Sequence, residues 1–126
     1  MTQIFLSVAA ILGGLSVAVG AFATHALREQ ISKRSLEIFE TGARYQMYHA
    51  LALFLVALLI SRTEFPQPTL VASGWLFIIG IAIFSGSLYA LSLTGIKSFG
   101  AITPLGGTVL IAGWGALAFA AWNLKL

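Results

Sequence analysis

Residues 70–93 read LVASGWLFIIGIAIFSGSLYALSL, a run without a charged side chain that is long enough to cross a lipid bilayer as one α-helix. The hydrocarbon core of a bilayer is about 30 Å thick, and about 20 apolar residues of helix cross it. One charge at the centre of such a helix costs about 2.5–3.5 kcal/mol on insertion scales. The sequence therefore predicts that this stretch spans a membrane.

Three further stretches have the same character, at residues 4–22, 45–60 and 104–124. They are continuous runs rich in Ala, Leu and Gly, which favours helices over the alternating segments of a β-barrel. Hydrophobic residues make up 59% of the 126 residues and charged residues 9%, whereas soluble domains carry about 25% charged residues. We therefore expect an all-α integral membrane protein, with four transmembrane helices in one compact bundle and a single domain over residues 1–126.

Local signals suggest where the spans begin and end. Thr103 followed by Pro104 is typical of an N-cap and a first helical residue, so the last span is predicted to begin at Pro104. Pro66 and Pro68 lie in a polar segment that predicts a tight turn before residue 70. The segment from Gly95 to Gly100 predicts the corresponding turn before the last span.

Lysine and arginine are unevenly distributed between the two sides of the membrane. Five lie in the connections that follow the first and third spans, and two lie on the opposite side; they are Arg28, Lys33, Arg34, Arg44 and Lys97 against Arg62 and Lys125. Basic residues are retained on the cytoplasmic side, so we expect both termini to lie outside the cytoplasm in a bacterial-type cytoplasmic (inner) membrane. Because these residues flank spans, they indicate topology and not a nucleic-acid partner.

The polar connection at residues 24–44 alternates apolar and charged side chains, as in Leu27, Ile31 and Phe39 among their charged neighbours. This pattern predicts a short amphipathic interfacial helix between the first two spans, lying in the headgroup plane. Ser32 or Ser35 could cap a helix that runs into the second span.

Polar side chains gather at the predicted cytoplasmic boundary and form a candidate functional or structural cluster. Its members are His25, Glu40, Arg44, Tyr45, Tyr48 and His49. Glu40 and Arg44 are spaced for a helical ion pair, so we expect Arg44→Ala to be the most damaging single change in the cluster.

The chemistry of this cluster has several interpretations. Two histidines are too few for zinc, which takes three or four ligands, and Glu40 and His49 are predicted to point to opposite faces. We expect no metal site and no cofactor. The interpretation that we favour is a hydrogen-bonded structural pair; the alternatives are a proton-handling or ligand-binding role and, least favoured, metal or haem ligation.

Small residues recur at helical spacing in the spans, where they let helix backbones approach closely in a lipid environment. Those predicted to form helix-packing faces are Gly14, Gly86, Thr108, Ala112, Ala116 and Ala120. These faces could pack within the bundle, or they could bind a second copy or another membrane protein.

Signals of an enzyme are missing from the sequence. It lacks a nucleophile elbow and a phosphate-binding loop, and it contains no cysteine that could serve as a nucleophile or metal ligand. We therefore expect a non-enzymatic structural, assembly or accessory subunit whose partners are the lipid bilayer and membrane proteins. One alternative is a small channel or carrier built on His25, Arg44 and His49, and another is a membrane-bound redox or haem protein.

Four segments resemble a known family. They are GAFATHAL at 20–27, FETGARYQMYHA at 39–50, FSGSLY at 84–89 and ITPLGG at 102–107. They resemble the domain-of-unknown-function 423 family, which includes small bacterial inner-membrane proteins of the YgdD/YwdK type and is similar to eukaryotic transmembrane protein 256. The resemblance implies a small multi-span membrane protein and supplies no catalytic residues.

Overall fold

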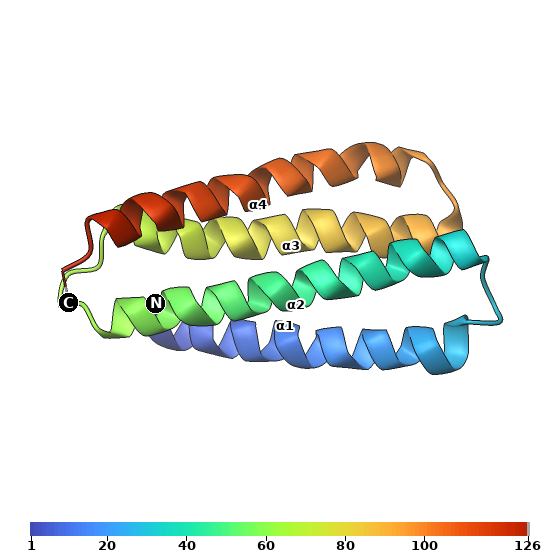
Figure 1. Ribbon diagram of the computed structural model, residues 1–126, viewed down its shortest axis with the longest axis horizontal. Helices are drawn as coiled ribbons and strands as arrows, with labels where there is room; N and C mark the ends of the chain where they lie inside the picture. The colour runs from blue at the N-terminus through green and yellow to red at the C-terminus, as the bar shows by residue number, and fades with distance from the viewer. Residues whose placement is uncertain (126) are drawn as a thin grey trace.

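The computed structural model of the protein describes residues 1–125 as four long α-helices joined by short turns (Figure 1). Helix α1 spans Thr2–Phe22 and continues as a π-helical turn, η1, at Ala23–Leu27; α2 spans Lys33–Ser61, α3 spans Pro68–Thr94 and α4 spans Ser98–Trp122. All four are long and apolar enough to cross a membrane. The predicted all-α class and the four spans are confirmed.

The helices follow one another up and down and pack in the order of the chain, α1 on α2, α2 on α3 and α3 on α4 (Figure 1). In the most apolar part of each helix, 50% of the residues are buried in α2 and 39% in α3, compared with 17% in the first span and 28% in α4. Helices α2 and α3 are therefore central, and α1 and α4 are peripheral. The α1 helix also reaches α3, where the ring of Phe5 occupies the space left by Gly74.

Within the described residues, no separate interfacial helix lies between the first two spans, so that prediction is wrong. Residues 23–27 prolong the first helix, residues 28–32 form a turn, and α2 runs unbroken from Lys33 to Ser61. The hydroxyl of Ser32 caps α2 by accepting a hydrogen bond from the Ser35 amide at 3.0 Å. Apolar side chains of this segment pack inside the bundle. Phe39, for example, is buried against Leu27 and Tyr89.

Helix α4 begins at Ser98 and contains Pro104 in its interior, so the predicted start at Pro104 is wrong. Thr103 is not an N-cap. Its hydroxyl lies 2.6 Å from the Ser87 hydroxyl of α3 and donates to the Phe99 carbonyl at 3.3 Å. A proline inside a helix forgoes one backbone hydrogen bond, and here the helix extends past it on its N-terminal side.

The two remaining turns lie within the predicted segments but are shorter, because α3 begins at Pro68 and α4 begins at Ser98. Gln67 is the N-cap of α3 and Pro68 is its first residue, a position where the missing N–H costs nothing. The Gln67 side chain donates to the Ala120 carbonyl at 3.0 Å, which ties this turn to the end of α4. Gly95 ends α3 with φ of 71°, a left-handed conformation that favours glycine.

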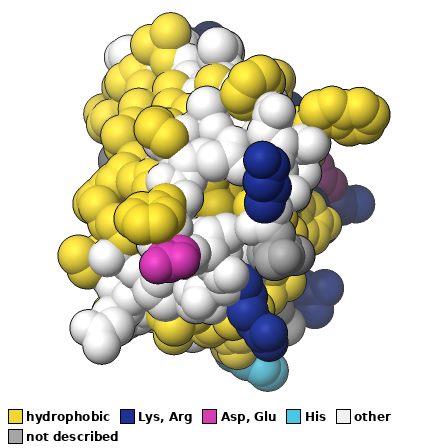
Figure 2. All heavy atoms as spheres, turned by 90° about the vertical axis from the view of Figure 1, so that its left-hand side faces the viewer, with side chains coloured by type: hydrophobic (Ala, Val, Ile, Leu, Met, Phe, Trp, Pro, Cys, Tyr) yellow, Lys and Arg dark blue, Asp and Glu magenta, His cyan; other side chains and the backbone are white. Residues whose placement is uncertain are grey.

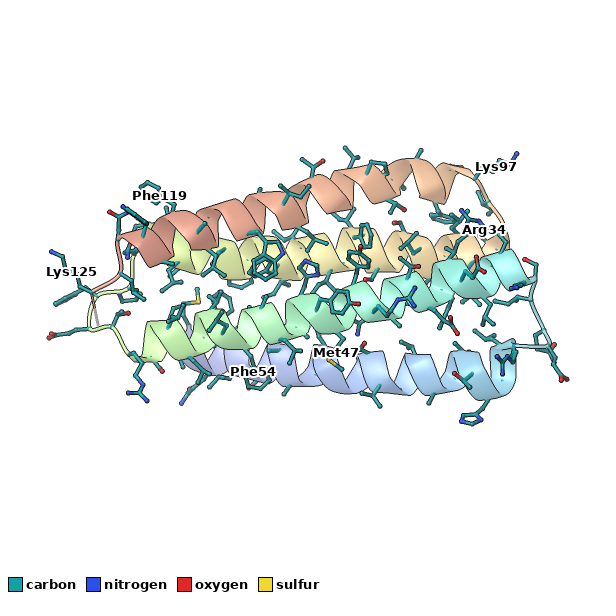
Figure 3. All side chains as sticks on the ribbon, viewed as in Figure 1. Arg34, Met47, Phe54, Lys97, Phe119 and Lys125 are labelled. Atoms are coloured by element: carbon teal, nitrogen blue, oxygen red, sulfur yellow. The ribbon has the colours of Figure 1, made fainter. Side chains whose placement is uncertain are left out.

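Both the N-terminus and the end of α4 lie at the same end of the molecule, together with the α2–α3 turn (Figure 1). Arg34 and Lys97 lie at the opposite end, and Lys125 lies with the termini (Figure 3). Figure 2 looks onto the end with the termini and shows a few charged side chains scattered among neutral and hydrophobic ones.

Close helix packing relies largely on small residues that were not predicted. A Cβ added at Gly106 would lie 2.4 Å from the Phe84 backbone nitrogen, and one at Gly113 would lie 2.8 Å from the Phe77 ring. Of the predicted packing residues, Ala120 is buried and Ala116 is half-buried, whereas the other four are exposed, namely Gly14, Gly86, Thr108 and Ala112. Packing of those four within the bundle is therefore wrong, and their binding of another chain stays a prediction.

Candidate functional site

His49 is buried in the second span and uses both of its ring nitrogens. Its Nδ1 lies 2.6 Å from the Tyr45 carbonyl, and its Nε2 accepts a hydrogen bond from Trp114 Nε1 at 3.1 Å. An indole N–H can only donate, so Nε2 must be the acceptor and Nδ1 carries the proton. The geometry therefore holds a neutral imidazole that links α2 to α4.

One turn before His49, Gln46 joins three helices. Its amide nitrogen donates to the Leu12 carbonyl of α1 at 2.8 Å, and its amide oxygen accepts from the Tyr89 hydroxyl of α3 at 2.7 Å. Both polar atoms of the Gln46 amide are thus paired with neighbouring helices. Gln46 and Tyr89 are not members of the predicted cluster, and the signal in the sequence that points to Gln46 is its spacing from His49 on one helical face.

Two buried serines bind the same segment of α2. Ser16 of α1 donates to the Ala43 carbonyl at 2.6 Å, and Ser85 of α3 donates to the Gly42 carbonyl at 2.7 Å. The absence of a side chain at Gly42 also leaves room for Tyr89, since a Cβ there would lie 2.9 Å from its ring. Residues 42–49 of α2 therefore receive hydrogen bonds from all three other helices.

The structure does not assemble the predicted boundary cluster as one site. His25 lies exposed in η1, and Arg44 is exposed and donates to the Thr41 hydroxyl at 3.3 Å. The predicted Glu40–Arg44 ion pair is wrong; within residues 1–125 the ion pair joins Arg34 and Glu37 at 3.8 Å. An exposed pair four residues apart on a helix contributes only about 0.2–0.5 kcal/mol, which is too little to impose its geometry.

Three of the predicted residues, Tyr45, Tyr48 and His49, do come together. They line an aromatic groove of about 500 Å³ between α2, α3 and α4, whose other lining residues are Phe84, Gly107, Leu110, Ile111 and Trp114. The ring centroids of Tyr45 and Phe84 are 5.0 Å apart, and those of His49 and Trp114 are 5.9 Å apart. We refer to this feature as the aromatic groove.

The arrangement can hold helices together more readily than it can move protons. Every buried polar side-chain atom of the described residues has a hydrogen-bond partner. His49 could accept a proton at Nε2 only if the Trp114 N–H moved away. Residues 1–125 also contain no group of three His, Asp or Glu side chains close enough to bind a metal ion.

Known proteins are similar to this chain over most of its length. The family model described as "Protein of unknown function (DUF423)" matches residues 19–107. The chain belongs to the DUF423 family. The match includes Gln46, His49 and Tyr89, whereas Trp114 lies beyond it.

Named relatives are bacterial membrane proteins. The chain is 45% identical over 112 residues to the UPF0382 membrane protein YwdK of Bacillus subtilis, covering 89% of this chain and 90% of that protein. It is 40% identical over 126 residues to a UPF0382 membrane protein of Haemophilus influenzae, covering 99% and 98%. No solved structure matches it. These matches confirm the predicted family and a small multi-span bacterial membrane protein.

Proposed function

We propose that this protein is a non-enzymatic structural, assembly or accessory subunit that docks a membrane partner on the exposed small-residue faces of its outer helices. The observation that carries the proposal is the exposure of Gly14 on α1 and of Thr108 and Ala112 on α4, the two peripheral helices. Small residues let a partner helix approach closely, and such packing drives helix association in lipid.

The use of polar side chains inside the spans supports this proposal. Gln46 and His49 form hydrogen bonds with residues of α1, α3 and α4 of the same chain. The serines that bind α2 do the same. What remains on the outer faces is mainly apolar, with small residues such as Gly14 and Ala112 between larger ones such as Leu15 and Ile111, which suits van der Waals contact with another helix.

The channel or carrier alternative has no comparable support. It requires His25, Arg44 and His49 to share a path, but the first two are exposed and His49 is buried behind Trp114. We also propose that both termini lie outside the cytoplasm in the inner membrane. The support is the distribution of basic residues, since five lie toward the end opposite the termini.

Cysteine cross-linking in native membranes tests the docking proposal. The chain contains no cysteine, so Ala112→Cys introduces a single reactive thiol on the proposed face. Ala118→Cys is the matched control, because it is an exposed alanine on another face of α4. We expect cross-linked products with Ala112→Cys only, identified by mass spectrometry as a second copy or another protein. Equal products from both variants, or none from Ala112→Cys, would contradict the proposal.

A further inference from the structure

A second groove, between α2 and α3, lies near the end of the molecule opposite the termini. It has a volume of about 380 Å³ and is lined by Arg34, Glu37, Ile38, Thr41, Arg44 and Leu88. Arg34 pairs with Glu37, whereas the contact found for Arg44 is the Thr41 hydroxyl. The Thr41 hydroxyl itself donates to the Glu37 carbonyl at 2.9 Å. The other N–H groups of the Arg44 guanidinium are well suited to bind phosphate oxygens, because they donate charge-assisted hydrogen bonds to them. We refer to this feature as the basic groove.

The length of α2 places the basic groove near one boundary of the hydrocarbon core. Ser61 is the last residue of α2, and Arg44 is 17 positions before it, which corresponds to about 25 Å of helix. The hydrocarbon core is about 30 Å thick. If Ser61 marks one boundary of this core, Arg44 lies close to the other.

The basic groove and the aromatic groove follow one another along the same helices. On α2, the lining residues Arg34, Ile38, Thr41, Tyr45 and Tyr48 recur at intervals of three or four, so they share one face. On α3, Leu88 borders the basic groove and Phe84 borders the aromatic groove one turn deeper. The surface is charged at headgroup depth and apolar below it, which is the polarity profile of a phospholipid.

The charge near this end favours an anionic lipid. Basic side chains outnumber acidic ones there, with Arg28, Lys33, Arg34, Arg44 and Lys97 against Glu29, Glu37 and Glu40. Figure 3 shows Arg34 and Lys97 at this end. Basic residues near a membrane surface attract anionic lipids.

We propose that these two grooves together bind one anionic glycerophospholipid. Its phosphate lies in the basic groove, where the Arg44 guanidinium donates hydrogen bonds to it and Arg34 adds positive charge. One acyl chain lies in the aromatic groove against Tyr45, Phe84 and Trp114.

Native mass spectrometry of the purified protein in a non-ionic detergent tests the headgroup part. The probes are dioleoylphosphatidylglycerol, dioleoylphosphatidylcholine and dioleoylphosphatidylethanolamine. We expect one bound phosphatidylglycerol, held about tenfold more tightly than either zwitterionic lipid. Arg44→Gln should weaken its binding about tenfold, through loss of a charge-assisted hydrogen bond. Arg62→Gln is the control, because Arg62 is an exposed arginine after the opposite end of α2, and it should leave binding unchanged.

A second pair of variants tests the acyl-chain part. A Cβ at Gly107 would lie 3.7 Å from the Phe84 ring, so Gly107→Leu fits locally and fills the aromatic groove. At Gly115, on the same helix, a Cβ would meet none of the described residues within 4 Å. We expect Gly107→Leu to weaken phosphatidylglycerol binding about tenfold and Gly115→Leu to leave it unchanged.

Four outcomes would overturn the proposal. Equal binding of phosphatidylglycerol and the zwitterionic lipids would remove the anionic preference. Equal weakening by Arg62→Gln and Arg44→Gln would show general charge attraction. Weaker binding in Arg44→Gln but not in Gly107→Leu would show a phosphate contact without an acyl chain in the aromatic groove. Equally tight binding of glycerol 3-phosphate would show the same.

Discussion

At the scale of single residues, one hydrogen bond between side chains joins α2 to α4 within residues 1–125, from Trp114 to His49. Trp114→Phe keeps a ring in place but removes the indole N–H, which leaves His49 Nε2 buried without its donor. We expect a loss of about 1 kcal/mol in the free energy of unfolding, measured as a lower melting temperature in detergent. Trp122→Phe is the control, because Trp122 is 91% exposed. A melting temperature unchanged by Trp114→Phe would show that the bond contributes no stability.

We expect Gln46, and not Arg44, to be the most sensitive polar residue. Arg44 makes one contact of 3.3 Å at an exposed position, whereas Gln46 makes hydrogen bonds of 2.8 and 2.7 Å to two other helices. We expect Gln46→Ala to reduce stability by about 1–3 kcal/mol, because Tyr89 and the Leu12 carbonyl both lose a partner. Arg44→Ala should cost less. Thermal unfolding of both variants in the same detergent compares them, and a larger loss for Arg44→Ala would restore the sequence-based expectation.

At the scale of helices, the glycines of α4 determine how closely it packs on α3. A methyl group at Gly106 would lie 2.4 Å from the Phe84 backbone, which cannot move away as a flexible side chain can. We expect Gly106→Ala to separate the two helices and to cost about 1–3 kcal/mol, the usual range for overpacking.

Gly115→Ala provides the control for that change, because its added methyl group would point away from the other described residues. Circular dichroism during heating of both variants gives the comparison. Similar melting temperatures for the two would mean that α4 shifts to accommodate the methyl group, in conflict with the packing seen here.

At the scale of the whole molecule, the structure puts both termini at one end, and the basic residues predict which side of the membrane this end faces. We expect Asn123→Cys to react with a membrane-impermeant maleimide on intact cells, and Gln30→Cys to react only after the membrane is opened. Accessible Gln30→Cys with protected Asn123→Cys would reverse the orientation. Moving basic residues from the first connection to the second should weaken the orientation preference.

The sequence by itself determined the number of spans, the helical class and the family. A continuous apolar run without the alternation of a barrel strand can pair its backbone N–H and C=O groups in lipid by forming a helix. Its length and its lack of charge therefore suffice to recognise a transmembrane helix. The Ser32 cap and the turn at Pro68 were also readable, because each depends on a few neighbouring residues. The candidate site was only partly predictable, with Tyr45, Tyr48 and His49 found and Gln46 and Trp114 missed.

Tertiary structure alone decided which face of each helix packs. In a membrane the faces toward lipid and toward protein are both apolar, so periodicity does not separate Ala112, which is exposed, from Gly113, which is buried. The polar partners are equally hidden from local patterns, because His49 and Trp114 are 65 residues apart in the chain and Gln46 and Tyr89 are 43 apart. Only the packing of α2 among the other three helices brings these side chains within hydrogen-bond distance.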